Sequence, residues 1–236
     1  MVRYNGPISI EEIASGIEAT IKNMEGLVAA AHTLVAAGSY GPAFGLSVMS
    51  LEEAGKLHAL RAMAQRGAIP GMKWRQLWSA FRNHNYKSSA GFMDCYSDET
   101  RANSDQIMEL ALQHEATAGL VESARQWSFY VDFDSETRDW NTPVEFDQRQ
   151  TVEVLAQAEV ALQRAQNHLA AGLFSVEALE LLRIVYEPFF RELLVKDGPV
   201  SLSELASGAV PYYQEWWARL SAAGIPDPLS GVRPLL

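Results

Sequence analysis

The stretch LSVMSLEEAGKLHALRAMA, from Leu46 to Ala64, is the part of the sequence that decides the predicted fold. Projected onto a helix at about 100° per residue, it places five apolar side chains on one stripe: Leu46, Met49, Leu57, Leu60 and Ala64. Glu53 falls within this stripe, and Lys56 follows three residues later, within reach of the carboxylate. Because burying an unpaired charge is unfavourable, the pair indicates a functional site or an ordered polar network. A solvated pair at the rim of a groove is the alternative.

Helices are predicted on both sides of this stretch. Ser9 and Glu12 have the spacing of a capping box and begin a first helix, which Gly38 ends. After the central helix, a third helix is expected from Gly71 through Lys87, followed by a connection over residues 88–98. Further helices are expected over residues 107–130, 142–172, 175–196 and from 201, and the alternation in residues 129–134 predicts an extended segment. The predicted class is all-α: a helical bundle over residues 1–146 with an α-helical C-terminal extension, residues 147–236, packed on it.

A second ionisable pair lies in the predicted third helix. His84 and Lys87 are three residues apart at the border of an aromatic face, as Glu53 and Lys56 are on the helix before. Antiparallel packing of these two neighbouring helices would bring the pairs together, so we predict one cluster of four side chains. For His84, a histidine satisfied at a helix end is the alternative.

Charge is distributed unevenly along the chain. The net charge is −10, yet residues 55–90 contain no Asp or Glu and seven basic residues, namely Lys56, Arg61, Arg66, Lys73, Arg75, Arg82 and Lys87. A basic segment in an acidic protein indicates a site for a phosphate-bearing ligand. Two solvated helix faces would show the same pattern.

Several classes of protein are poorly supported by the sequence. The single cysteine, Cys95, excludes an internal disulfide, and no secretory signal opens the chain. No apolar run reaches the ~18 residues of a membrane span, so a cytoplasmic protein with no membrane partner is expected. The P-loop, G-x-G-x-x-G, C-x-x-C and G-x-S-x-G motifs are absent, and so is the Glu-x-x-His pattern of di-metal bundles. No metal or cofactor is expected.

Three segments carry a family resemblance: LEEAGKLH at 51–58, FRNHNYK at 81–87 and RQWSFYVDFD at 125–134. They resemble the AbiV family of abortive-infection proteins, which belongs to the HEPN superfamily of small α-helical bundles, and the resemblance covers residues 9–146. It implies an HEPN-like bundle with a role in antiviral defence. HEPN relatives commonly act as metal-independent ribonucleases whose site forms across a homodimer.

The resemblance also selects site residues. The family's E-E-x-G-K element falls on Glu52, Glu53, Gly55 and Lys56, its H-x-x-K element on His84 and Lys87, and its Y-V-D-F element on residues 130–133. The candidate catalytic residues are Glu53, Lys56, His84 and Lys87. The candidate substrate-binding residues are Arg82, Asn83, Arg125, Tyr130 and Asp132. His84 is suited to proton transfer near neutral pH, and Lys56, Lys87 and Arg125 to stabilising negative charge.

One departure from the nuclease-active HEPN proteins leaves the activity open. Their R-x4-6-H signature is absent, since Arg164 and His168 have three residues between them and Arg75 and His84 have eight. Three functions therefore remain. The first is a HEPN-type metal-independent ribonuclease toxin that acts on RNA and blocks translation or phage growth. The others are a noncatalytic module that binds a phage or host protein or a nucleotide, and a bundle whose polar cluster only sets helix register.

The expected partners follow from the first of these functions. They are RNA as substrate, a phage-encoded activator or antitoxin, and a second copy of the chain in a homodimer. The central helix has a further face of small and apolar residues where another helix could approach, formed by Val48, Leu51, Gly55, Ala59 and Ala62.

Overall fold

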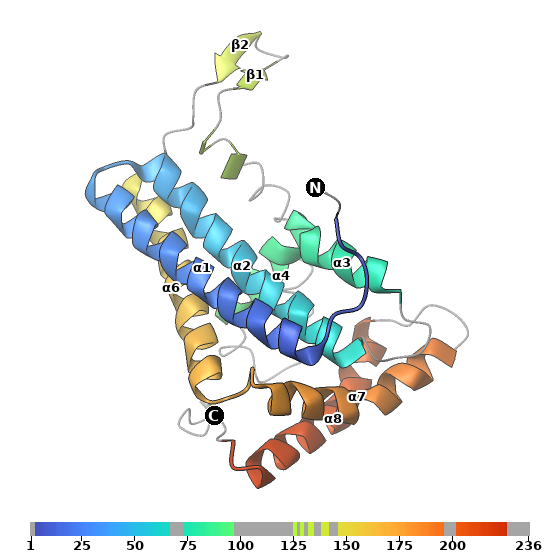
Figure 1. Ribbon diagram of the computed structural model, residues 1–236. Helices are drawn as coiled ribbons and strands as arrows, with labels where there is room; N and C mark the ends of the chain where they lie inside the picture. Colours follow the sequence, from blue (N-terminus) through green and yellow to red (C-terminus); the bar gives the residue numbers. More distant parts are fainter. Residues whose placement is uncertain are drawn as a thin grey trace. The chain divides into compact units, whose positions relative to one another are not determined.

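The structure is a computed structural model that describes residues 3–66, 73–96, 125–126, 128–129, 132–134, 138–141, 146–195 and 202–225 (Figure 1). Its helices are α1 (Ile10–Ala36), α2 (Tyr40–Arg66), α3 (Trp74–Arg82), α4 (His84–Tyr96), α6 (Gln148–Ala170), α7 (Val176–Val195) and α8 (Leu202–Ala222). Two short strands, β1 (Asp132–Asp134) and β2 (Asp139–Asn141), form an antiparallel ribbon in which Phe133 pairs with Trp140. The predicted all-α class is confirmed, and the extended segment predicted at 129–134 contains β1.

The ends of the first helices follow the predicted capping chemistry. The Ser9 amide donates a hydrogen bond to Glu12 Oε2 (2.7 Å), and the Glu12 amide donates to Ser9 Oγ (3.2 Å), so the capping box forms. After α1, Gly38 has a φ of +73°, which glycine adopts without steric strain. None of the described helices is long and apolar enough to cross a membrane.

The predicted third helix is wrong in its extent. The helix is interrupted at Asn83. The side-chain Oδ1 of Asn83 accepts a hydrogen bond from the Tyr86 amide (3.1 Å) and so caps a new helix, α4. Residues 88–96, predicted as a connection, are therefore helical. The apolar periodicity is nearly continuous across residues 74–87, which is why the pattern alone did not reveal the break.

The predicted helix at 142–172 begins later than expected. Asp147 Oδ1 accepts a hydrogen bond from the Gln150 amide (2.7 Å), which places the cap just before Gln148. Residues 142–145, the predicted start, lie outside the described residues, as does most of the predicted helix at 107–130. The last helix, α8, has 21 residues and is longer than the short helical end expected from the sequence.

The chain forms two compact units, each assembled from separated segments. Unit 1 comprises residues 1–18, 58–80 and 164–236, and unit 2 comprises residues 19–57 and 81–163. α1, α2, α3 and α6 contribute to both units. The compact units therefore do not follow the division at residue 146 that the sequence suggested.

Unit 2 is organised around the first part of α2, which is buried on several sides. Its core takes apolar residues from three helices: Ile21, Met24, Val28 and Ala31 of α1, Phe44, Val48, Leu51 and Leu57 of α2, and Leu155, Ala158 and Ala161 of α6. The single stripe predicted for α2 is therefore incomplete, since Leu46 and Met49 are only half-buried. A helix with neighbours on several sides has no single apolar face.

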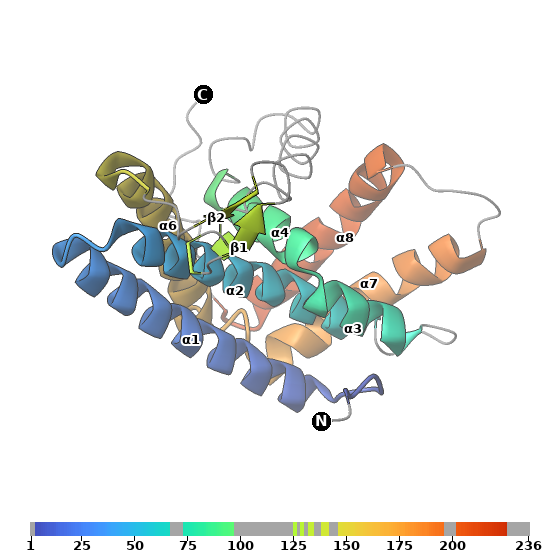
Figure 2. The ribbon, with the colours of Figure 1, turned by 90° about the horizontal axis from the view of Figure 1, so that it is seen from above.

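α4 packs against α2 in unit 2 at unusually short range (Figure 2). A Cβ atom placed on Gly55 would lie 1.9 Å from the carbonyl oxygen of Lys87, and one placed on Gly91 would lie 1.9 Å from that of Leu51. Only glycine at both positions allows the two backbones to approach so closely. Part of the small-residue face of α2 is thus covered by α4 of the same chain. Leu51 and Gly55 are therefore not available for contact with a second copy of the chain.

Unit 1 has a core rich in aromatic residues. α7 and α8 lie side by side there (Figure 1), and their buried members include Leu179, Leu182, Tyr186, Phe189, Phe190, Trp216 and Leu220. The end of α2 is held by two cation–π contacts, Arg61 over Trp216 (5.6 Å) and Arg66 over Phe190 (4.7 Å).

Candidate functional site

A buried carboxylate, Glu52, lies at the centre of the polar cluster of unit 2. Its side chain is only 6% exposed, and its Oε2 lies 2.8 Å from His84 Nδ1 and 3.6 Å from Lys87 Nζ. Its Oε1 lies 3.2 Å from Arg125 Nε. Three basic side chains thus converge on one carboxylate, an arrangement that can offset the cost of burying its charge.

The close approach of α2 and α4 explains this geometry. Glu52 precedes Gly55 on α2 by three residues and therefore lies on the same face of the helix. The Lys87 backbone meets Gly55 directly, and His84 stands one turn earlier on α4. The glycine contact therefore brings both side chains of α4 to the carboxylate of α2.

The pair predicted within α2, Glu53 and Lys56, also forms. Glu53 Oε1 and Lys56 Nζ are 2.5 Å apart, and the ammonium lies 5.8 Å from the centre of the Phe81 ring. Glu53 is only partly buried, however, and its effect on Lys87 of α4 is electrostatic: its negative charge raises the pKa of the Lys87 ammonium and so opposes the effect of burial. His84 and Lys87 therefore pair with Glu52 and not with its neighbour Glu53, because the helix that approaches α2 lies on the side of Glu52.

Lys87 is the most deeply buried cation of the cluster. Its side chain is 7% exposed, and this burial lowers the pKa of its ammonium below the ordinary value. The attraction of Glu52 opposes that shift, while the positive charge of Lys56 reinforces it. The ammonium of Lys87 therefore gives up its proton more readily than that of an exposed lysine.

His84 lies at the edge of the cluster and is much more exposed than Lys87. Its side chain is half exposed, and Glu52 accepts a hydrogen bond from Nδ1. A carboxylate on Nδ1 selects the imidazole tautomer whose Nε2 can accept a proton. The histidine is thus oriented in the way a general base requires.

The predicted substrate-binding residues are placed unevenly. Arg125 joins the cluster through Glu52, and Arg82 is half-buried at the end of α3. Asn83 is exposed and caps α4. Asp132 belongs to β1, opposite Asn141, and its side chain lies outside what the structure describes, as does Tyr130 altogether.

Glu52 is the residue that reasoning from helical periodicity missed. It belongs to the E-E-x-G-K element, but only Glu53 of the two glutamates falls on the apolar stripe used to identify the site. The signal that could have identified Glu52 is its position on the face of Gly55 and Ala59, where small residues predict a close helix.

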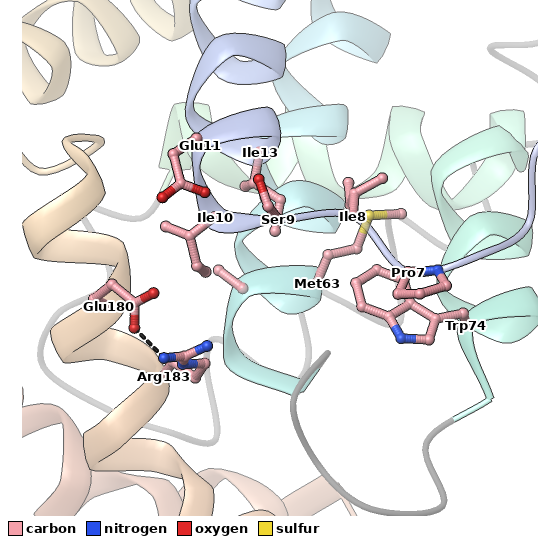
Figure 3. Close-up of a pocket in the computed structure, with 11 residues that line it drawn as sticks. Pro7, Ile8, Ser9, Ile10, Glu11, Ile13, Met63, Trp74, Glu180 and Arg183 are labelled. Carbon is pink, nitrogen blue, oxygen red and sulfur yellow. Dashed lines mark ion pairs between the residues drawn. The ribbon is translucent and has the colours of Figure 1, made fainter.

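A pocket of about 350 Å³ lies in unit 1 (Figure 3). It is lined by apolar side chains, among them Ile10, Met63 and Trp74, and by the ion pair of Glu180 and Arg183. None of the predicted site residues lines it. It is therefore a feature of unit 1 that is distinct from the polar cluster.

Comparison with known families agrees with the resemblance seen in the three sequence segments. The family model for AbiV matches residues 12–163. No curated protein and no solved structure matches the chain. Because the family match covers well over half of the sequence and includes every helix of the polar cluster, the protein belongs to the AbiV family of the HEPN superfamily.

Proposed function

We propose that this protein is an abortive-infection factor that cleaves RNA without a metal ion at the cluster around Glu52. The observation that carries the proposal is the buried carboxylate that holds a histidine, a lysine and an arginine together. Membership of the AbiV family supports the role in phage defence.

The cluster offers the groups that RNA cleavage needs. A base must take the proton of the ribose 2′-hydroxyl, and cations must stabilise the negative charge that builds up on the phosphate. His84, oriented by Glu52, is suited to the first task. Lys56, Lys87 and Arg125 are suited to the second.

The charges of the cluster favour a phosphate ligand. Two carboxylates, Glu52 and Glu53, stand among three basic side chains, those of Lys56, Lys87 and Arg125. A site with surplus positive charge and little exposure binds an anion more strongly than a solvated surface does, because a low dielectric strengthens the attraction. Since the protein as a whole is acidic, this attraction is local.

The biological setting belongs to the same proposal. The protein acts in the cytoplasm, where its cleavage of RNA blocks translation or phage growth. It works as a homodimer, and a phage-encoded activator or an antitoxin controls it.

The test is the decay of labelled total RNA incubated with purified protein in EDTA, alone and with extract from phage-infected cells. We expect RNA decay with the wild-type protein and at least a 100-fold slower rate with His84→Ala, because general base catalysis contributes about that much. His32→Ala is the matched control, since His32 is an exposed histidine on α1 that pairs with Glu159 outside the cluster.

The absence of the R-x4-6-H signature favours a second function, a noncatalytic module that binds a phage or host protein or a nucleotide. If RNA stays intact under both conditions while the protein is folded, this second function replaces the first. Equal decay with wild-type protein and His84→Ala would remove the cluster from the reaction.

A further inference from the structure

His84 and Lys87, both on α4, face the same carboxylate oxygen of Glu52. Both lie in the first turn of α4, and their nitrogen atoms Nδ1 and Nζ lie 2.8 Å and 3.6 Å from Glu52 Oε2. One phosphate group is small enough to face both side chains at once. The cluster thus holds two groups that can transfer protons, placed side by side by a shared anchor.

The two groups differ in ways that suit them to opposite halves of a reaction. His84 is half exposed, and its Nδ1 is engaged by Glu52, so that Nε2 is the nitrogen that can accept a proton. Lys87 is almost fully buried beside a carboxylate, and its side chain ends in an ammonium, which is a proton donor only.

The other cations of the cluster are less suited to this role. Arg125 keeps its proton at any physiological pH, because a guanidinium is effectively always charged. Lys56 is paired with a different carboxylate, Glu53, at 2.5 Å and lies over the Phe81 ring, so it is not anchored beside His84 as Lys87 is.

We propose that Lys87 is the general acid of this site and protonates the departing 5′ oxygen, while His84 takes the proton of the 2′-hydroxyl. This assignment rests on the ribonuclease function proposed above. The lowered pKa of Lys87, caused mainly by its burial, supports it, because a more acidic ammonium is the better proton donor.

The step balances within the substrate and these two side chains. The 2′ oxygen forms a bond to phosphorus as its proton passes to His84 Nε2, and the bond from phosphorus to the 5′ oxygen breaks as that oxygen takes a proton from Lys87 Nζ. The products are a 2′,3′-cyclic phosphate and a 5′-hydroxyl, and nothing is oxidised or reduced.

The leaving group provides the test. We compare an RNA oligonucleotide with its analogue in which sulfur replaces the bridging 5′ oxygen, because a thiolate departs without needing a proton from an acid. Lys87→Arg keeps the positive charge but cannot act as an acid near neutral pH, and Lys87→Met removes both. Lys22→Arg, at an exposed position of α1, is the matched control.

The expected result is a loss of about 100-fold in the cleavage rate of the all-oxygen RNA by Lys87→Arg, with less than a tenfold loss for the sulfur analogue. Lys87→Met should also recover activity on the sulfur analogue, and Lys22→Arg should match the wild type on both substrates. Circular dichroism establishes that each variant is folded.

Two results would overturn the role of Lys87 as general acid while leaving the ribonuclease function in place. Equal losses on both substrates would make Lys87 a source of charge or of structure, and undiminished cleavage by both variants would remove it from the reaction. If the wild-type protein cleaves neither substrate, the ribonuclease function itself falls, and the role of Lys87 falls with it.

Discussion

Glu52 and Glu53 are adjacent glutamates with different roles. Glu52 is buried and pairs with three basic side chains, whereas Glu53 is partly exposed and pairs with one. Because the buried carboxylate compensates Lys87 and Arg125, its removal would leave positive charge in a poorly solvated place. The difference between the two residues can be measured with matched variants.

Glu52→Gln keeps the volume of the side chain and removes its charge. We expect it to lower the free energy of unfolding by about 3 kcal/mol, the cost of breaking a buried ion pair, and to slow RNA cleavage at least 100-fold. Glu53→Gln is the control and should cost less than about 1 kcal/mol, since it breaks one partly exposed pair. Urea denaturation measures both values.

The reverse order would contradict this account. If Glu53→Gln destabilised the protein or slowed cleavage more than Glu52→Gln does, the centre of the cluster would lie at Glu53 and not at Glu52.

At the scale of elements, the crossing of α2 and α4 builds the site. Gly55 and Gly91 let the two backbones touch, and that contact carries His84 and Lys87 to Glu52. The same contact makes the site sensitive to a single methyl group, because the atom in the way is a backbone carbonyl that cannot rotate aside.

Gly55→Ala should therefore separate the two helices. We expect a loss of about 1–3 kcal/mol in the free energy of unfolding, as for other overpacked contacts, together with loss of RNA cleavage. Gly26→Ala on α1 is the control, because nothing lies within 4 Å of a Cβ atom there. That variant should gain about 0.5–1 kcal/mol from the higher helix propensity of alanine and keep its activity. Chemical denaturation with the RNA decay assay checks both, and an unaffected Gly55→Ala would show that the crossing tolerates a wider spacing.

At the scale of the whole molecule, the proposed site is small. One chain supplies one His84 and one set of cations, and a twofold axis would bring two such clusters together and strengthen the positive potential that faces a nucleic acid. The face of α2 around Gly55 does not serve this purpose, because α4 covers it.

We expect a homodimer in solution. Light scattering at micromolar concentration should give twice the 26.1 kDa mass of one chain. The mass of a single chain, unchanged over a tenfold range of concentration, would exclude the dimer and leave a site that works within one chain.

Much of this molecule was determined by the sequence alone. Residue spacing predicted the all-α class, the capping box of Ser9 and Glu12, and the pair of Glu53 and Lys56. These features are local, since each depends on residues within one or two turns of a helix. The segments at 51–58, 81–87 and 125–134 likewise indicated the AbiV family before any fold was known.

Only the tertiary structure decided which carboxylate is central. Helical periodicity shows which side chains share a face, but it does not show how many neighbours a helix has or on which side they approach. α2 has buried residues on several sides, so a reading that assumed one apolar stripe selected Glu53. The neighbour that mattered, α4, exists as a separate helix because Asn83 caps it, and it approaches where Gly55 leaves room, which puts Glu52 at the centre of the cluster.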